Sequence, residues 1–216
     1  SKKGSEMKIK KLVLVGVFLI GFLFSGFDFG HCEEEFPEWV PEGAMEAAKK
    51  SLTDDVEDSA RFYKVKAEDI PECEIRHPYE VIYITYLDYE VGEDIRNLFK
   101  REQRFGFGVY LLNRWIGEVG GTFENNQWKF HSGARINRDK DYLGEIYNKY
   151  QISDSIKIYR THFMRYFVEK NGKITRIITI EPYKGTSYFE PETFMLEKKQ
   201  AIIRANKRLE RIRKKD

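Results

Sequence analysis

An apolar run near the amino terminus constrains this chain most, because it separates a short leader from everything that can fold in water. Met7-Lys-Ile-Lys-Lys11 is basic, and the 13 residues from Leu12 to Phe24 are all apolar or glycine. A basic leader before an apolar stretch is typical of segments that enter a secretory translocon. We therefore expect residues 7–32 to be a signal peptide or membrane anchor. The rest of the chain is then expected to be extracytoplasmic, either secreted or membrane-anchored.

The fate of this segment has three alternatives. Three lysines between positions 8 and 11 precede it and four acidic residues between positions 28 and 35 follow it, which favours an inside amino terminus. It is shorter than the ~20 apolar residues of a spanning helix, and Phe24-Ser25-Gly26 lacks small residues at both positions that a signal peptidase requires. Cleavage and retention therefore both stay open. Cys32 sits where the lipidated cysteine of a bacterial lipoprotein would sit, although His31 replaces the usual Gly or Ala. Residues 1–6 are interpreted as a non-native leader.

Composition favours one folded domain after this segment. Aromatic residues make up 15% of the chain, so a core can form and disorder is not expected. Residues 33–190 are expected to form the domain, and residues 191–216 a basic terminal helix. Two cysteines, Cys32 and Cys73, could pair in an oxidising compartment.

The net charge of +2 conceals a strong polarity. Residues 33–100 hold 19 acidic and 8 basic residues, a net charge of −11, whereas residues 101–216 hold 24 basic and 14 acidic residues, a net charge of +10. The two halves could neutralise each other by packing together. Alternatively, the basic half could present a surface to an anionic partner.

Strand patterns and one hairpin outline the first part of the sheet. Residues 79–89 and 107–112 are rich in β-branched and aromatic residues, as strands are. Asn125 and Asn126 tolerate the backbone of a two-residue turn. Such a turn places Phe123 opposite Trp128, Gly121 opposite Phe130, Val119 opposite Ser132, Thr122 opposite Lys129 and Gly120 opposite His131.

A second hairpin is expected to turn at Asn171-Gly172, with arms over residues 157–170 and 173–183. This register places Arg165 opposite Ile178 and Phe167 opposite Arg176. Helices are expected at 42–52, at 92–102, at 141–150 and from Pro191 onward, with an acidic turn at 53–59. Together these patterns predict an α+β fold, in which helices pack on an antiparallel sheet of about five strands.

Residues 75–135 resemble bacterial exported or membrane-anchored proteins of unknown function with a cystatin-like or PepSY-like α+β domain. The likeness rests on Pro78-Tyr79, on Asn113-Arg-Trp-Ile-Gly117 and on Asn125-Asn-Gln-Trp-Lys-Phe130, with the stretch from Gly117 to Trp128 as its centre. It implies an antiparallel sheet against a helix and transfers no catalytic residues.

Candidate chemistry is sparse. The second hairpin would place His162 opposite Glu181, and such a pair could act as an acid/base unit, although a cross-strand ion pair is the commoner interpretation. His31-Cys32-Glu33-Glu34-Glu35 contains metal-ligand residue types but reads as a linker, so we expect no metal site. The chain contains no nucleophile elbow, phosphate-binding loop, dinucleotide fingerprint or zincin helix. We therefore expect no cofactor.

The basic terminal helix is the sharpest binding candidate. Ala201, Ile202, Ala205, Leu209 and Ile212 form a narrow apolar stripe. Basic residues that could bind a partner flank it: Lys198, Lys199, Arg204, Lys207, Arg208 and Arg211. The simpler interpretation is that this stripe packs on the domain. The alternative is that the helix contacts anionic lipid or an acidic partner.

These observations predict a non-catalytic, extracytoplasmic, membrane-associated module that binds a protein or an anionic envelope polymer. Nucleic acid is not an expected partner outside the cytoplasm. Two alternatives are a small envelope hydrolase or transferase that uses His162 and Glu181, and a structural subunit of a membrane assembly.

Overall fold

The structure is a computed structural model that describes residues 37–132, 140–161, 164–181 and 185–213. The chain divides into two compact units, Ser1–Glu35 and Phe36–Asp216, and all the described residues belong to the second. The leader, the expected signal or anchor segment and Cys32 lie outside the described residues.

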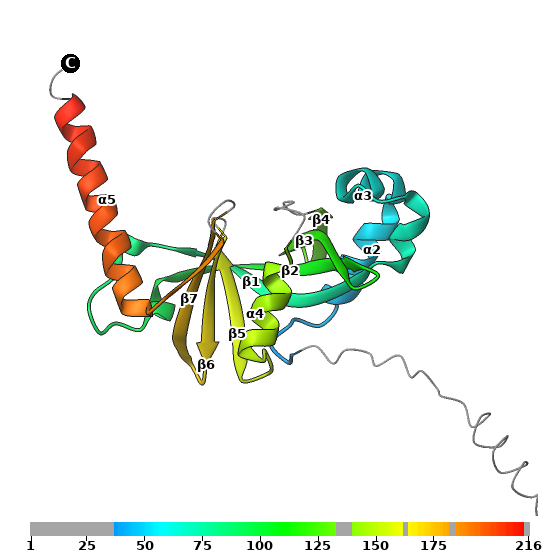
Figure 1. Cartoon of the computed structure of the whole chain (residues 1–216), viewed down its shortest axis with the longest axis horizontal. Coiled ribbons are helices and arrows are strands. Elements are labelled where there is room, and N and C mark those ends of the chain that lie inside the picture. The colour runs from blue at the N-terminus through cyan, green and yellow to red at the C-terminus, as the bar shows by residue number, and fades with distance from the viewer. Residues whose placement is uncertain (1–36, 133–139, 162–163, 182–184, 214–216) are drawn as a thin grey trace, which may run out of the picture. The chain divides into compact units, whose positions relative to one another are not determined.

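Eight described strands form one sheet with the order β4-β3-β2-β1-β5-β6-β7-β8. The first four are β1 (Glu74–Ile84), β2 (Phe99–Leu111), β3 (Arg114–Glu124) and β4 (Gln127–Ser132). The last four are β5 (Ile156–Thr161), β6 (Arg165–Lys170), β7 (Lys173–Glu181) and β8 (Gly185–Phe189). Each set is an antiparallel meander, and the two meanders join where β1 runs parallel to β5 (Figure 1).

The expected α+β fold with an antiparallel sheet of about five strands is therefore wrong. The protein has a mixed α/β fold, because the described sheet holds eight strands and its central pair is parallel. Sequence patterns find strands and tight hairpins, but a parallel pair joins segments that are far apart in the chain. Nothing in either segment specifies its neighbour.

Helices precede each meander. α2 (Ala44–Asp54), α3 (Val56–Tyr63) and the short helix η1 (Ala67–Glu72) precede β1, and α4 (Tyr142–Tyr150) precedes β5. The two halves thus repeat one order, helix and then four antiparallel strands. A two-fold rotation about an axis parallel to β1 and β5 would exchange the halves and also the faces of the sheet. In agreement with this relation, the core of the first half lies on one face and the core under α4 lies on the other.

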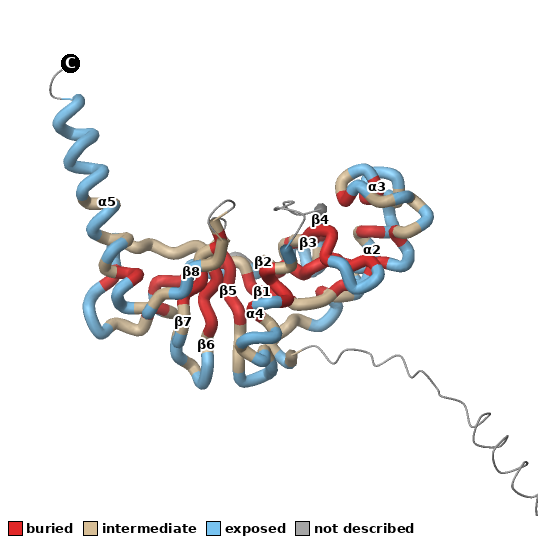
Figure 2. Tube along the Cα trace, in the orientation of Figure 1, coloured by how far each residue is buried: buried red, intermediate tan, exposed pale blue. Residues whose placement is uncertain are grey.

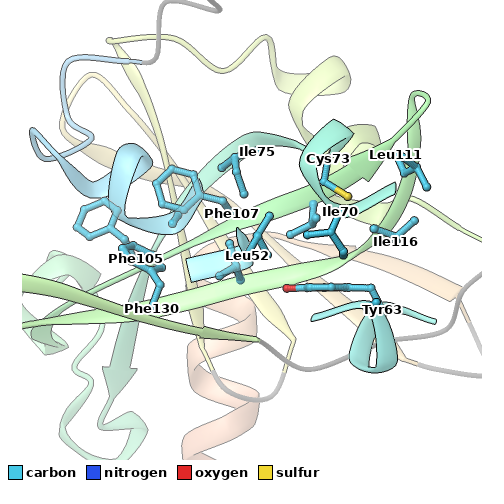
Figure 3. Packing of buried hydrophobic residues seen from close by; sticks show 14 of the residues in the cluster. Leu52, Tyr63, Ile70, Cys73, Ile75, Phe105, Phe107, Leu111, Ile116 and Phe130 are labelled. Atoms are coloured by element: carbon cyan, nitrogen blue, oxygen red, sulfur yellow. The ribbon is translucent and has the colours of Figure 1, made fainter. Parts of the chain in front are cut away.

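The core of the first half lies between its helices and β1 to β4 (Figure 3). Leu52 of α2, Tyr63 of α3 and Ile70 of η1 pack over Phe107 and Val119, and all five are almost fully buried. Apolar burial of this kind supplies the main favourable term in folding. The helices are therefore fixed on this meander.

The second half is covered on both faces. On one face, Leu143 and Ile146 of α4 pack over Ile158, Tyr166 and Ile178. On the other face, the first turns of α5 (Pro191–Arg213) and the short helices η2 (Tyr86–Asp88) and η3 (Ile95–Leu98) cover the strands. Consecutive buried apolar residues, Tyr166 to Val168 in β6 and Ile177-Ile178 in β7, reflect this double burial.

The first hairpin confirms its expected register. β3 and β4 pair Phe123 with Trp128 and Gly121 with Phe130, and the remaining expected pairs also form. Asn125 and Asn126 have φ values of 53° and 61°, as a type I′ turn requires at both positions.

The expected register of the second hairpin is wrong beyond its turn. Lys170 pairs with Lys173 as expected, but a bulge follows and shifts the later pairs by one residue. Phe167 therefore pairs with Ile177, and Arg165 with Thr179. The expected arm over 157–170 is also two strands, β5 and β6, because the chain reverses before Met164, whose φ is 54°.

The helices at 42–52, 141–150 and 191 onward are confirmed within a few residues. The helix expected at 92–102 is wrong, because only the short helix η3 forms there and β2 begins at Phe99. The expected turn at 53–59 is wrong, because α3 starts there. The sequence held a signal for this helix, because Asp55 is a residue type favoured at helix starts. In the structure, the side chain of Asp55 accepts a hydrogen bond from the Asp58 amide at 2.9 Å and caps α3.

Candidate functional site

A groove of about 550 Å³ opens on the sheet face that α2 covers. Its floor comes from β1 and β2, one wall from the chain before α2, and the other wall from the β3–β4 hairpin. The lining residues are Pro41, Glu42, Glu80, Arg101, Gln103, Phe105, Phe123 and Trp128. A β-bulge lies at this floor, since Val81 pairs with Arg104 and Ile82 with Arg101, which leaves two extra residues in β2.

Aromatic rings form an unbroken row along the groove. Phe105 lies 6.4 Å from Trp39 in a stacked geometry and 5.8 Å from Trp128 in an edge-to-face geometry, between ring centroids. Trp128 continues the row to Phe123 at 5.1 Å. Phe123 is 37% exposed and Trp128 is half-buried, so both present ring surface to the groove.

The wall before α2 is held in place by contacts to a distant loop. The Trp39 indole donates a hydrogen bond to the Ser153 carbonyl at 3.2 Å, and the Glu38 amide donates to Asp154 Oδ1 at 2.6 Å. These bonds cross more than a hundred positions of sequence. The groove is therefore a formed feature of the folded unit.

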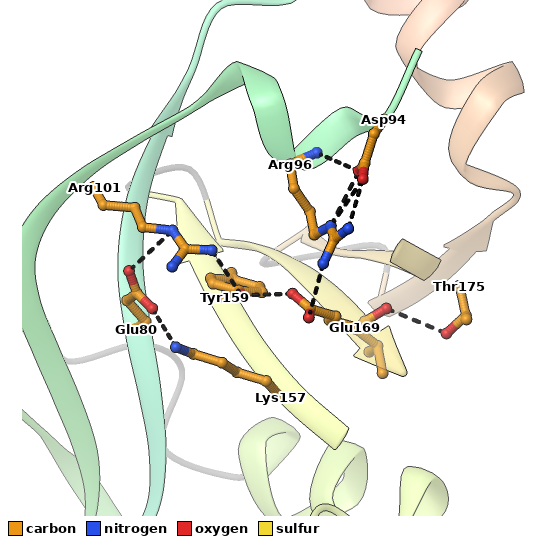
Figure 4. Close-up of polar contacts among 9 residues, drawn as sticks. Glu80, Asp94, Arg96, Arg101, Lys157, Tyr159, Glu169 and Thr175 are labelled. Atoms are coloured by element: carbon orange, nitrogen blue, oxygen red, sulfur yellow. Dashed lines mark hydrogen bonds and ion pairs between the residues drawn. The ribbon is translucent and has the colours of Figure 1, made fainter. Parts of the chain in front are cut away.

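A polar network runs from the groove floor into the second half (Figure 4). The buried Glu80 carboxylate pairs with Lys157 Nζ at 2.6 Å and with Arg101 Nε at 3.7 Å. Arg101 also donates to the Tyr159 hydroxyl at 3.2 Å, which in turn donates to Glu169 at 2.6 Å. Burial makes the largest contribution to a raised pKa of Tyr159, and the hydrogen bond to Glu169 makes the second largest. This hydroxyl therefore stays neutral and acts as a donor. The floor is thus polar, rigid and internally paired.

A second polar cluster is buried on the opposite face of the sheet. Glu118 is 1% exposed and forms an ion pair with Arg160, which is 9% exposed. The Tyr79 hydroxyl donates to Glu118 at 3.1 Å and lies 2.5 Å from Arg160 Nη1. Burial raises the pKa of Glu118, while Arg160 opposes that shift. A charged pair this deep joins the two meanders, because Glu118 is on β3 and Arg160 on β5.

His77 belongs to a neighbouring chain of hydrogen bonds. The Tyr110 hydroxyl donates to Asp141 Oδ2 at 2.8 Å, and His77 Nδ1 lies 2.7 Å from the same hydroxyl. Because that hydroxyl has one proton, Nδ1 must be the donor. Asp141 also caps α4 by accepting from the Gly144 amide at 2.8 Å. Burial lowers the pKa of His77 to about 4, against a weaker opposing effect of Asp141.

Because folding lowers the pKa of His77, we predict that the protein loses stability in mild acid. The unfolded chain binds a proton at His77 below about pH 6.5, whereas the folded chain binds it only near pH 4. The free energy of unfolding should therefore fall as pH drops from 6.5 to 4, by at most about 3 kcal/mol from this residue. Denaturant titrations should show that the free energy of unfolding of His77→Asn depends less on pH over this range than that of the wild type. Asparagine suits the site because φ is 55° there. The exposed His131→Asn serves as the control, and equal profiles for the two variants would contradict the assignment.

The basic candidates divide into two groups along α5. Phe194 and Met195 are buried against the sheet, and Lys199 Nζ donates to the Tyr89 carbonyl at 2.6 Å. Lys198 lies 5.1 Å from the centre of the Phe194 ring. Lys198 and Lys199 are therefore half-buried and bound to the domain. By contrast, every residue from Arg204 to Arg213 is exposed, including Lys207, Arg208 and Arg211 (Figure 2).

The distal part of the apolar stripe of α5 does not pack on the domain, although Ile202 is half-buried, so that interpretation is wrong for the end of the helix. Leu209 is 54% exposed and Ile212 is 50% exposed. α5 leaves the sheet at the end opposite α2 and α3 (Figure 1). The exposed part of α5 therefore lies away from α2 and α3, whereas Glu80 of the acidic half pairs with Arg101 and Lys157 of the basic half.

The expected His162–Glu181 pair, which stays a prediction, and Cys73 are the remaining candidates. His162 lies outside the described residues, and Glu181 ends β7, opposite Gly185. Cys73 has a buried free thiol that donates to the Asp69 carbonyl at 3.5 Å, and burial raises its pKa to about 11. Across the described ranges, no cluster of three His, Cys, Asp or Glu side chains could hold a metal ion.

Sequence reasoning missed the groove and both polar clusters. Glu80 and Lys157 meet only because β1 pairs with β5, and Glu118 meets Arg160 for the same reason. The available signals were Glu80 and Glu118, each an acid flanked only by apolar residues or glycine within its strand. Those positions predict buried partners, but not their identity.

Comparison with known proteins assigns no family. No family model, curated protein or solved structure matches the chain. The resemblance to cystatin-like or PepSY-like exported proteins stays a prediction. Within the described residues, no helix combines the length and apolarity that crossing a bilayer requires.

Proposed function

We propose that this protein is a non-catalytic, extracytoplasmic, membrane-associated module whose groove binds a protein segment or an envelope polymer. The observation that carries the proposal is the partly exposed pair of aromatic rings, Phe123 and Trp128, beside a charged floor. Concave sites with apolar walls and a few fixed polar groups are the usual form of ligand sites. The apolar amino-terminal run supports the extracytoplasmic placement.

The groove suits an extended ligand with apolar and polar parts. Trp128 and Phe123 can cover apolar surface of a peptide side chain or a sugar ring. Gln103 and the guanidinium of Arg101 can donate hydrogen bonds beside them. Because Glu80 already pairs with two cations, the floor does not need to rearrange when a ligand enters. A preformed site of this kind binds with less loss of conformational freedom.

The chemistry of the lining favours binding over catalysis. Its described residues include no serine, threonine, cysteine or histidine, the usual nucleophiles and proton shuttles. The carboxylate of Glu80 is held by Lys157 and Arg101, so both of its oxygens already have cationic partners.

Binding by groove variants tests the proposal. The purified full chain would be titrated against insoluble envelope polymer and, separately, against immobilised envelope proteins. Trp128→Ser should weaken binding to one of these by about tenfold or more, as loss of an aromatic anchor does. Phe123→Ser, which removes a more exposed ring, should act in the same direction with less effect on folding.

Tyr188→Ser is the matched control, because Tyr188 is a 43% exposed aromatic residue outside the groove. Its binding should equal that of the wild type. Absence of binding by the wild-type chain, or equal binding by the groove variants and the control, would refute the proposal.

A further inference from the structure

The exposed half of α5 combines a strong positive charge with an apolar stripe. Residues 204–213 hold five Lys or Arg and one acidic residue, Glu210. Leu209 and Ile212, one turn apart on the helix, are each at least 50% exposed. In the part of the chain that the structure describes, nothing covers this surface.

This half of the helix is poorly stabilised by its own sequence. Arg204 and Arg208 are four residues apart, as are Lys207 and Arg211, and like charges at this spacing repel across one helical turn. The buried anchors Phe194 and Met195 lie in the first turns, so they do not support the distal end. A surface of negative charge would therefore stabilise the helix as well as bind it.

We propose that residues 202–213 of α5 lie on a bilayer surface that carries anionic headgroups. The charge complementarity selects the partner, since each Lys or Arg near such a surface contributes attraction, and the narrow stripe of Ile202, Leu209 and Ile212 can enter the headgroup region. A second copy of this helix is disfavoured, because Arg208 and Arg213 flank the stripe and would repel their equivalents. The proposal does not depend on what the groove binds.

Hydrogen exchange of the full chain tests this contact. The chain would be placed in nanodiscs of phosphatidylcholine alone and in nanodiscs that also contain phosphatidylglycerol. Amides of residues 203–213 should exchange about tenfold more slowly in the anionic nanodiscs, and added salt should remove the difference. Because both nanodiscs hold any amino-terminal anchor equally, the difference reports on α5.

Charge variants give the matched control. Arg204→Gln, Lys207→Gln, Arg208→Gln and Arg211→Gln combined should abolish the protection, while glutamine keeps the helix propensity. Glutamine substitutions of four exposed basic residues at the other end of the unit, Lys49, Lys50, Arg61 and Lys66, should leave the protection of α5 intact. Leu209→Ser with Ile212→Ser should reduce it.

Equal exchange in neutral and anionic nanodiscs would overturn the proposal. Protection that appears with soluble polyglutamate but not with anionic nanodiscs would also overturn it, because the partner would then be an acidic polypeptide.

Discussion

Arg160→Met should lower the free energy of unfolding by about 3–5 kcal/mol, the largest effect we expect from a single substitution. Methionine fills a similar volume but leaves the carboxylate of Glu118 without its cation, and Glu118 is 1% exposed. The hydroxyl of Tyr79, which bonds both partners, also loses a contact. Equilibrium urea denaturation measures the change directly.

The pH dependence of this variant identifies the cause. Without Arg160, the pKa of Glu118 should rise further, so protonation in mild acid removes the uncompensated charge. The loss relative to the wild type should therefore be smaller at pH 5 than at pH 8. Arg176→Met breaks the exposed pair with Glu190 and should lose less than about 1 kcal/mol. Similar losses for both variants would show that Arg160 is not a buried charge partner.

Gly106→Ala should lower the free energy of unfolding by about 3 kcal/mol, at the upper end of the range for overpacking. A Cβ at this position would overlap the ring of Tyr79. That ring is 2% exposed and its hydroxyl is fixed by Glu118 and Arg160, so it cannot turn away. The strand must shift instead, and thermal or urea denaturation should detect the loss.

Gly120 provides the control, because it pairs with Gly106 across β2 and β3. The nearest atom to a Cβ at Gly120 is the Phe105 carbonyl oxygen at 3.8 Å, which is ordinary contact. Gly120→Ala should therefore change stability by less than about 0.5 kcal/mol. If Gly106→Ala and Gly120→Ala lower the free energy of unfolding equally, the loss comes from reduced backbone flexibility and not from overlap with the Tyr79 ring.

Local signals predicted local structure well. Asn125-Asn126 fixed the register of β3 and β4, because a two-residue turn determines every pair beyond it. Asn171-Gly172 identified the turn between β6 and β7, but the bulge beyond Glu169 left no recognisable pattern. One unrecognised residue was enough to displace the later pairs.

Contacts between distant segments could not be predicted. Residues that pair across β1 and β5 are about eighty positions apart, and many strand orders suit the same apolar patterns. The sheet is therefore larger than expected and contains a parallel pair. Both polar clusters at the junction of β1 and β5 were missed for the same reason. The sequence pattern correctly predicted that α5 is a helix. It could not predict whether the sheet would pack against the apolar stripe of this helix, because that depends on where the sheet ends.

The groove and α5 together suggest how the protein could work at a membrane. α5 and the groove wall at the β3–β4 hairpin belong to opposite ends of the sheet order. A contact between α5 and lipid would leave the aromatic row free for a ligand. Both roles can therefore operate in one molecule.

Site-specific photocrosslinking tests the binding role of the groove most directly. A photoreactive residue at Gln103, which is exposed and lines the groove, would be compared with one at Tyr188 in cells that make the full chain. We expect a discrete crosslinked product with an envelope protein or polymer from position 103 alone. The same products from both positions, or none from position 103, would contradict it.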